Sequence, residues 1–390
     1  MQAGLIVLCL AYVLSQFFRA FLAVLSQVLA ADLGAGADDL AFASGLWFLS
    51  FAAMQLPVGW ALDKIGPRRS AAVLLLLGGA GGAAVFALAT LPWHIAAAMF
   101  LIGIGCSPVL MASYYIFARE YPPAQFATLA ALMLGVGSAG NLVASYPTAL
   151  AVEWIGWRET LAGLAVVSAL VAAGIWATVK DPARLETGEK GSVLDLFRMP
   201  ALWPIMALMF VNYAPAGALR GLWAGPYFAD VHGFSTGQTG VVTLVMGCAM
   251  IAGTLTYGPL DKRLGTRKWL VLGGNLICAL ALAMLAVTAA GPAWVAAALI
   301  ALVGFSGAAF PVIIAHGRAF VPAHLAGRGV TLLNLFGIGG VGIMQFASGR
   351  MHVGLAEAGT AMPYQALFAF FALVMALGCA IYLFSKDNMG

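Results

Sequence analysis

The chain has 390 residues, of which 63% are hydrophobic and 9% are charged. A soluble domain uses about 25% charged residues to cover its surface, so this composition excludes an ordinary soluble protein. The 19 Lys and Arg residues outnumber the 15 Asp and Glu residues, but in a membrane protein the placement of basic residues matters more than their sum. We therefore expect the lipid bilayer as a partner and no nucleic acid.

Twelve segments are apolar over about 20 residues, the length that a helix needs to cross the hydrocarbon core. Helices are expected because lipid offers the backbone no hydrogen-bond partner. The first segment lacks a basic n-region and a small-residue cleavage site, so we interpret it as a membrane span and expect nothing to be removed. In chain order the expected spans are residues 4–31, 41–62, 70–90, 94–118, 125–148, 158–179, 201–228, 236–260, 268–289, 293–317, 327–349 and 363–385.

One long polar stretch, Lys180 to Arg198, separates the first six spans from the last six. It begins as a loop and ends with the pattern of a short amphipathic helix at the membrane surface. We expect a six-helix bundle at 1–180, a cytoplasmic linker with this helix at 181–200, and a second six-helix bundle at 201–390.

The basic residues outside the spans are distributed very unevenly, which predicts the orientation. If the N-terminus is cytoplasmic, only Arg158 and Arg350 lie on the opposite side. We therefore expect a multi-pass protein of the cell inner membrane with both termini in the cytoplasm. The cytoplasmic set is Lys64, Arg68, Arg69, Arg119, Lys180, Arg184, Lys190, Arg198, Lys262, Arg263, Arg267, Lys268, Arg318, Arg328 and Lys386.

The two halves of the chain repeat each other. The loop after the second span reads GWALDKIGPRR (59–69), and the loop after the eighth reads GPLDKRLGTRK (258–268). Two similar bundles with a central site are a common plan of secondary transporters. The first loop resembles the signature of the major facilitator superfamily, and the resemblance covers the whole chain. It rests on Gly59, Asp63, Lys64, Gly66, Arg68 and Arg69.

This resemblance implies a fold of twelve transmembrane helices in two pseudo-symmetric six-helix bundles, with transport by alternating access. It implies no enzymatic activity and no cofactor. A carboxylate at the cytoplasmic end of a helix can pair with arginines and accept bonds from a facing helix N-terminus. The alternative is a loop that only sets topology. The expected gating residues are Gly59, Asp63, Gly66, Arg68, Arg69 and, one position early in the second loop, Asp261.

Two features of the superfamily's proton-coupled drug antiporters are missing. Met99 stands where a mid-helix arginine is expected in span four, and the glycine ladder LGVGSAGN of span five contains no Gly-Pro pair. Away from their ends, the spans also contain no Asp or Glu. These absences disfavour an exporter of hydrophobic compounds or drugs, which stays the alternative interpretation.

Two arginines, Arg19 and Arg220, lie inside spans one and seven without an acidic residue nearby in sequence. Each ionised side chain at mid-bilayer costs about 2.5–3.5 kcal/mol on insertion scales. Both have a tyrosine seven residues upstream, Tyr12 and Tyr213, and the two pairs are 201 residues apart. We interpret the arginines as contacts for an anionic substrate; the alternative is that they extend to an interface or bind helix carbonyls.

The resemblance to the superfamily's organophosphate and organic-anion carriers extends to these two arginines only. The sequence thus predicts a secondary transporter of a small organic anion that bears a carboxylate or phosphate. His316 is the candidate proton carrier, so coupling to protons or to a counter-transported anion stays open. The expected substrate contacts are Arg19, Arg220, Tyr12, Gln16, Tyr213, Trp223, Tyr227, Tyr114, Tyr115, Asn141, His316 and Asn334.

Two further interpretations carry less weight. Met246 and Met250 form a pair of soft ligands that suits Cu(I), although such spacing arises easily among 16 methionines, and we expect no metal site. The five cysteines lie in apolar segments and are expected to be buried.

A transporter-like sensor or scaffold is the other alternative to a transporter of organic anions. No ATP-binding loop is present, and we expect a monomer.

Overall fold

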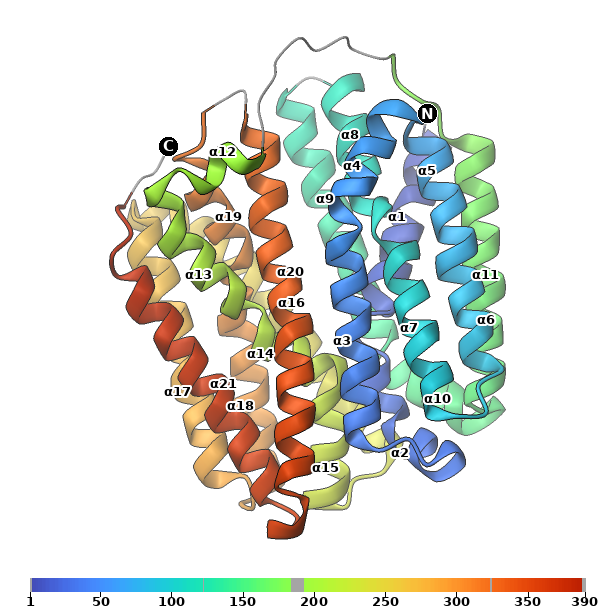
Figure 1. Cartoon of the computed structure of the whole chain (residues 1–390), viewed down its shortest axis with the longest axis vertical. Coiled ribbons are helices and arrows are strands. Elements are labelled where there is room, and N and C mark those ends of the chain that lie inside the picture. Colours follow the sequence, from blue (N-terminus) through green and yellow to red (C-terminus); the bar gives the residue numbers. More distant parts are fainter. Residues whose placement is uncertain (1, 122, 184–192, 323–324, 388–390) are drawn as a thin grey trace. The chain divides into compact units, whose positions relative to one another are not determined.

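The computed structural model describes residues 2–121, 123–183, 193–322 and 325–387 (Figure 1). Every regular element in these ranges is a helix, because lipid leaves the backbone no other partner than itself. The chain folds into two compact units. Unit 1 comprises Met1–Glu186 and Ser235–Leu244, and unit 2 comprises Thr187–Phe234 and Val245–Gly390. Residues 184–192 of the expected linker lie outside the described residues.

Unit 1 contains the helices of the first half of the chain. They are α1 (Gln2–Phe17), α2 (Leu22–Leu33), α3 (Ala37–Ala53), α4 (Gln55–Lys64), α5 (Pro67–Leu74), the π-helix η1 (Leu75–Ala80), α6 (Gly81–Ala87), α7 (Pro92–Cys106), α8 (Pro108–Glu120), α9 (Pro123–Val143), α10 (Tyr146–Ile155) and α11 (Trp157–Thr178).

Unit 2 contains the remaining helices, except that the first residues of α16 belong to unit 1. They are α12 (Val193–Phe197), the 3-10 helix η2 (Pro200–Leu202), α13 (Trp203–Asn212), α14 (Ala214–Ala218), the π-helix η3 (Leu219–Trp223), α15 (Ala224–His232), α16 (Thr236–Leu264), α17 (Arg267–Thr288), α18 (Ala293–Ser306), the 3-10 helix η4 (Gly307–Ala309), α19 (Phe310–Arg318), α20 (Ala326–Gly354), the 3-10 helix η6 (Ala356–Ala358) and α21 (Met362–Tyr382).

Each of the twelve expected spans coincides with one of these helices or with a run of them. Among the described residues, ten runs are long and apolar enough to cross a membrane, and the bent pair formed by α1 and α2 adds an eleventh. The expected fifth span is α9, whose segment Leu132–Val143 is a shorter apolar helix. The prediction of an all-helical, multi-pass membrane protein is confirmed.

The fifth span ends earlier than the sequence pattern predicts. Helix α9 stops at Val143, and α10 starts at Tyr146 with Pro147 in its first turn. Proline has no backbone N–H to donate, so it favours the start of a new helix over the continuation of an old one. The Thr148 hydroxyl donates to the Val143 carbonyl at 2.6 Å and covers one of the freed acceptors.

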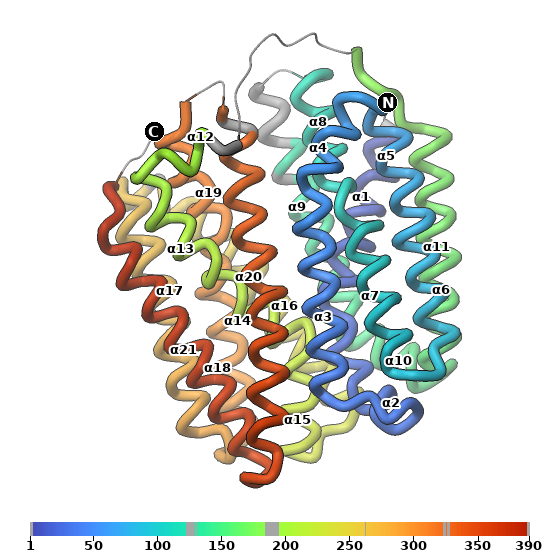
Figure 2. The backbone as a smooth tube through the Cα atoms, in the orientation of Figure 1, coloured from blue at the N-terminus to red at the C-terminus, as the bar shows by residue number. Residues whose placement is uncertain are grey.

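Glycines allow close helix packing inside each unit. In unit 1, α1 packs against α9, and a Cβ on Gly140 would lie 2.0 Å from the Val13 carbonyl oxygen. In unit 2, α13 packs against α20, and a Cβ on Gly340 would lie 1.9 Å from the Phe210 carbonyl oxygen. Small residues at helix contacts are the usual means of association in lipid. Helix α20 extends along the whole height of unit 2 (Figure 2).

Candidate functional site

The first span is broken at the residues that carry Arg19. Helix α1 ends at Phe17, α2 begins at Leu22, and the two axes differ by 53°. The backbone amides of Arg19 and Ala20 bond three residues back, to Gln16 and Phe17, instead of four. The segment contains neither proline nor glycine, the residues that usually mark such a break. Phe17 and Phe21 stack at 5.6 Å, and both are buried.

The Arg19 guanidinium lies between aromatic rings. Its central carbon is 5.2 Å from the Trp47 ring centroid and 4.9 Å from that of Phe51, both on α3. Its Nε atom is buried and has no hydrogen-bond partner among the described residues. Aromatic faces attract a cation without accepting the directed bonds that its N–H groups can donate. The Arg19 Nε–H group therefore has no acceptor in the described part of the chain.

Arg220 lies in an even more enclosed position in unit 2. It belongs to η3, a short π-helix inside the seventh span, and is 1% exposed. π-helical turns are found often at functional sites because they turn a side chain away from the regular helix register. One Nη atom donates to the Tyr213 hydroxyl at 2.8 Å, and Nε has no partner in the described part of the chain.

Several arginines of the described part of the chain form ion pairs with aspartates, but Arg19 and Arg220 do not. The ion pairs among the described residues join Arg68 to Asp181, Arg119 to Asp63, Arg198 to Asp195 and Arg267 to Asp261. Neither Arg19 nor Arg220 takes part in such a pair. Within these limits, the structure agrees with the sequence expectation that the two guanidiniums have no carboxylate counter-ion.

Predicted substrate contacts of unit 1 lie on α1 and on helices that pack against it. The Tyr12 hydroxyl accepts a bond from the Gln16 amide at 3.1 Å, and the Tyr12 ring fills the space above Gly137 on α9. Asn141, also on α9, is 7% exposed with a buried side-chain oxygen that has no partner among the described residues. Tyr114 is half-buried on α8, which also contacts α1.

The predicted neighbours of Arg220 are largely engaged within unit 2. The Trp223 indole donates to Gln345 and Ser348 at 2.9 Å each. The Tyr227 hydroxyl donates to the Ala289 carbonyl at 2.8 Å. Both side chains are fully buried, so their bonds give them a structural role in this conformation.

His316, another predicted substrate contact, is also engaged within unit 2. The His316 ring is fully buried, with Nδ1 2.6 Å from the Tyr382 hydroxyl and Nε2 2.9 Å from the Lys386 carbonyl. Both ring nitrogens thus fix the end of α21 and the residues after it. Asn334 is half-buried on α20.

The aromatic neighbours of Arg19 were missed by sequence reasoning. Trp47 and Phe51 stand in an apolar run of α3, where such rings are normal, and nothing in the sequence indicates their contact with Arg19. Asp230, at the end of α15, accepts a hydrogen bond from the Tyr364 hydroxyl, a contact that the sequence does not indicate either. Only the distance in space identifies these partners.

The signature loop forms its contacts with other helices of unit 1. Asp63, at the end of α4, lies 3.8 Å from the Arg119 guanidinium on α8. That guanidinium also covers the Tyr115 ring at 4.3 Å. The structure therefore places Tyr115, an expected substrate contact, beside Arg119 and so near Asp63, the carboxylate expected to act in gating.

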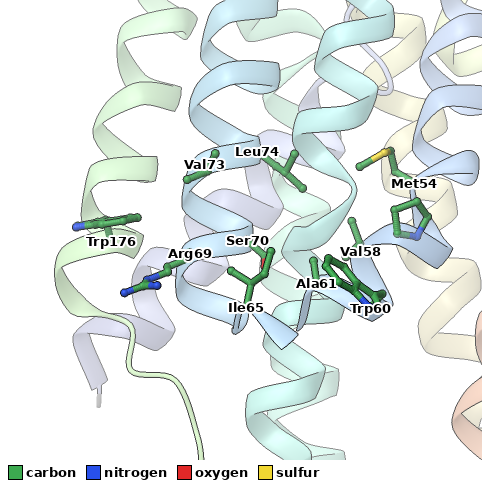
Figure 3. Close-up of a pocket in the computed structure, with 11 residues that line it drawn as sticks. Met54, Val58, Trp60, Ala61, Ile65, Arg69, Ser70, Val73, Leu74 and Trp176 are labelled. Atoms are coloured by element: carbon green, nitrogen blue, oxygen red, sulfur yellow. The ribbon is translucent and has the colours of Figure 1, made fainter. Parts of the chain in front are cut away.

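Gly66 and Arg68 meet a second carboxylate. The Arg68 backbone amide donates to Asp181 at 2.8 Å, at the N-terminus of α5. Gly66 has φ +109°, and a Cβ there would lie 2.7 Å from the Asp181 carboxyl carbon. Gly59 lies in open space on α4. Arg69 instead lines an apolar groove of unit 1 (Figure 3).

The second loop repeats this arrangement in unit 2 with different partners. Asp261 accepts from Arg267 Nε at 3.3 Å, and an Arg267 Nη atom donates to the Ala315 carbonyl at 3.3 Å. Asp387 accepts from the Lys268 backbone amide at 3.0 Å, at the N-terminus of α17.

The suggested soft-metal pair has a packing role. Met246 and Met250 both contact the position of Gly304 on α18. No group of three or more His, Cys, Asp or Glu residues arranged to hold a metal occurs in the described ranges. Cys106, Cys278 and Cys379 are buried, Cys9 is partly exposed, and Cys248 is exposed. The expectation that all five cysteines are buried is therefore wrong for Cys248, because α16 turns this residue outward.

Comparison with known proteins agrees with this architecture. Residues 8–344 match the model of the Major Facilitator Superfamily. The chain therefore belongs to the major facilitator superfamily, a class of membrane transporters, as the signature loop predicted. A bacterial homologue of the human lysosomal transporter Spinster, in an inward-facing and occupied conformation, has the same fold. Its TM-score is 0.76 and its identity 18%, over 98% of this chain and 96% of that one.

Two relatives are similar in sequence. The 4-hydroxybenzoate transporter PcaK of Pseudomonas aeruginosa is 26% identical over 176 residues, which is 45% of this chain and 39% of that protein. The probable sulfoacetate transporter SauU of Cupriavidus necator is 23% identical over 289 residues, covering 69% of this chain and 66% of that protein. The chain thus matches well under half of the first relative's length.

Proposed function

We propose that this chain moves a small organic anion, bearing a carboxylate or phosphate, across the inner membrane by alternating access. Arg19 and Arg220 both contact the anion. The observation that carries the proposal is the Arg220 guanidinium, which is 1% exposed and bonded to the Tyr213 hydroxyl. A buried cation without a counter-ion is unfavourable, and an anionic substrate supplies the missing charge. The planar fork of arginine matches a carboxylate or phosphate.

The names of the two relatives support this substrate class. 4-Hydroxybenzoate carries a carboxylate on an aromatic ring, and sulfoacetate carries a carboxylate and a sulfonate. Both are small organic anions. Tyr12, Gln16, Tyr114 and Asn141 are proposed as further contacts because they lie on α1 or on helices that pack against it.

The proposal includes the orientation and the gate. Both termini are cytoplasmic, in line with the uneven distribution of Lys and Arg. Asp63 acts in the cytoplasmic gate through Arg119, which lies 3.8 Å away. His316 has both ring nitrogens within bonding distance of other groups of unit 2, so we assign it a structural role and not that of proton carrier.

Transport and ligand binding of the purified protein test the proposal. Proteoliposomes are assayed for uptake of 4-hydroxybenzoate and of sulfoacetate, and the detergent-solubilised protein for a ligand-induced rise in Tm. Arg220→Ala and Arg19→Ala should each weaken binding about 30-fold or more, the scale for losing one member of a buried charge pair. Arg220→Lys should recover part of the loss, since it keeps the charge without the fork.

Arg198→Ala is the matched control, because this side chain is 85% exposed and forms only a surface pair with Asp195. It should leave uptake and binding unchanged. The anion proposal is wrong if Arg19→Ala and Arg220→Ala retain full binding and flux. Stabilisation by hydrophobic cations alone would indicate the exporter instead. Binding of anions without flux in proteoliposomes would indicate a sensor.

A further inference from the structure

An apolar groove lies on unit 1 where α4 ends, α5 begins and α11 ends. It has a volume of about 460 Å³, and its lining is apolar except for Arg69 and Ser70 (Figure 3). The spans that form it end at Lys64, begin at Pro67 and end at Thr178, so the groove lies at the boundary of the membrane. None of these helices carries Arg19 or Arg220.

Two polar groups of this groove have no protein partner among the described residues. Ser70 is 6% exposed, and its hydroxyl is buried without a hydrogen bond. Arg69 is exposed and forms no ion pair there, whereas its neighbour Arg68 is bound to Asp181. A buried hydroxyl without a partner in the protein can still donate to a bound water, ion or polar head group. The preceding residue, Arg69, supplies an exposed positive charge.

The rim of the groove has the character of a membrane interface. Trp60 is 62% exposed and Trp176 is 48% exposed, and both line the groove. Tryptophan is enriched where the hydrocarbon meets the head groups, because the ring is apolar and its N–H is polar. Ile65 and Val73 are more than 40% exposed beside them. A surface with these properties suits an acyl chain below a phosphate.

We propose that this groove binds one anionic phospholipid of the cytoplasmic leaflet. The phosphate accepts bonds from Arg69 and Ser70, and an acyl chain lies in the apolar groove between Trp60 and Trp176. Basic pockets between transmembrane helices on the cytoplasmic side bind anionic lipid head groups for the same electrostatic reason. The assignment of the leaflet rests on the orientation proposed above. The site itself does not depend on the transported substrate.

Native mass spectrometry of the delipidated protein tests this site directly. The protein is titrated with phosphatidylglycerol and with phosphatidylcholine of the same acyl chains. Wild-type protein should bind one phosphatidylglycerol more tightly than phosphatidylcholine. Arg69→Gln should lower the affinity for phosphatidylglycerol about tenfold, the usual effect of losing a hydrogen bond to a charged group. Ser70→Ala should lower it by a smaller factor.

Arg198→Gln is the control, because it removes an exposed positive charge outside the groove. It should bind phosphatidylglycerol as the wild type does. The proposal is overturned if Arg69→Gln binds phosphatidylglycerol like the wild type, or if Arg198→Gln loses as much affinity. It is also overturned if glycerol phosphate, which lacks acyl chains, raises Tm as much as the lipid does.

A second measurement covers the case in which Arg69→Gln fails to fold. Phosphatidylglycerol with brominated acyl chains, at low mole fraction in phosphatidylcholine nanodiscs, should quench wild-type tryptophan fluorescence. The Trp60→Phe, Trp176→Phe double variant should lose most of this quenching. Trp294→Phe, which removes a 74% exposed indole in unit 2, should lose little. Equal losses in the two variants would contradict a bound lipid in this groove.

Discussion

At the scale of single residues, polar side chains of this apolar chain form hydrogen bonds to charged groups, and such bonds are stronger in apolar surroundings. The Tyr213 hydroxyl accepts a hydrogen bond from the Arg220 guanidinium at 2.8 Å, and Asp181 accepts one from the Arg68 backbone amide at 2.8 Å. A hydrogen bond to a charged group contributes about 1.5–3 kcal/mol. The contact of Asp181 also requires that the neighbouring residue, Gly66, has no side chain and so leaves room for it.

Gly66 provides that room for Asp181, and its replacement is our prediction at this scale. Gly66→Ala should lower the free energy of unfolding by about 1–3 kcal/mol, because φ of +109° is unfavourable for alanine and the new Cβ would collide with the carboxylate. Thermal unfolding followed by tryptophan fluorescence measures the change.

Gly59→Ala is the control in the same loop region. Gly59 lies in α4 with nothing within 4 Å of an added Cβ. Alanine is favoured over glycine in a helix by about 0.5–1 kcal/mol, so this variant should be as stable as the wild type or slightly more. Equal stability of the two variants would contradict the role assigned to Gly66.

At the scale of helices, each unit holds the N-terminus of a span with an aspartate from a distant segment. Asp181 follows α11 and binds the start of α5; Asp387 follows α21 and binds the start of α17. Thr266 adds a hydroxyl that donates to Asp387 and also accepts from the Trp269 amide. Helix N-termini attract negative charge, since their first amides are free.

Asp387 should make stability depend on pH. Partial burial raises its pKa, but the bonds from the Thr266 hydroxyl and the Lys268 amide outweigh this and lower the pKa below its ordinary value of 3.8. Its contribution is therefore complete above that value and is lost as the pH falls through the lower, folded-state pKa. Asp387→Asn should cost about 0.3–1 kcal/mol at pH 7, with a difference from wild type that shrinks under strong acid.

Thermal unfolding from pH 7 to pH 2 follows this difference. Asp195→Asn serves for comparison, because Asp195 forms a surface pair with Arg198, and such pairs contribute about 0–1 kcal/mol. It should change Tm less than Asp387→Asn at pH 7. A gap between Asp387→Asn and wild type that widened on acidification would show that the sign is wrong.

At the scale of the whole molecule, the placement of basic residues predicts the orientation of the chain in the membrane. Fifteen of the 19 Lys and Arg residues belong to the expected cytoplasmic side. Basic residues near the ends of spans are retained on that side during insertion. The two repeated halves then present their signature loops to the same compartment.

Cysteine labelling should confirm this orientation. In a variant without the five native cysteines, Arg350→Cys should react with a membrane-impermeant maleimide on intact spheroplasts, whereas Lys386→Cys should react only after permeabilisation. Both positions are exposed, so access from the correct compartment decides the result. The reverse pattern would invert the proposed topology.

Much of the architecture could be predicted from the sequence. Runs of about 20 apolar residues specify helices by themselves, because each helix satisfies its own backbone hydrogen bonds in lipid. The spans, their division into halves and the signature loop that indicates the superfamily all follow from local patterns. The same holds for Arg19 and Arg220, since a charge inside an apolar run is visible without any contact.

The tertiary structure decided what these residues touch. The helix break at Phe18–Phe21 contains no proline or glycine that would predict it from the sequence. The stacked rings of Phe17 and Phe21 at this break are visible only in the structure. Asp63 binds Arg119, which is 56 positions away, and not the arginines beside it. Trp223 and Tyr227 look like free ligands in the sequence but bond inside unit 2. Hydrogen bonds within a helix are local and so are encoded locally, whereas side-chain partners depend on which helices pack together.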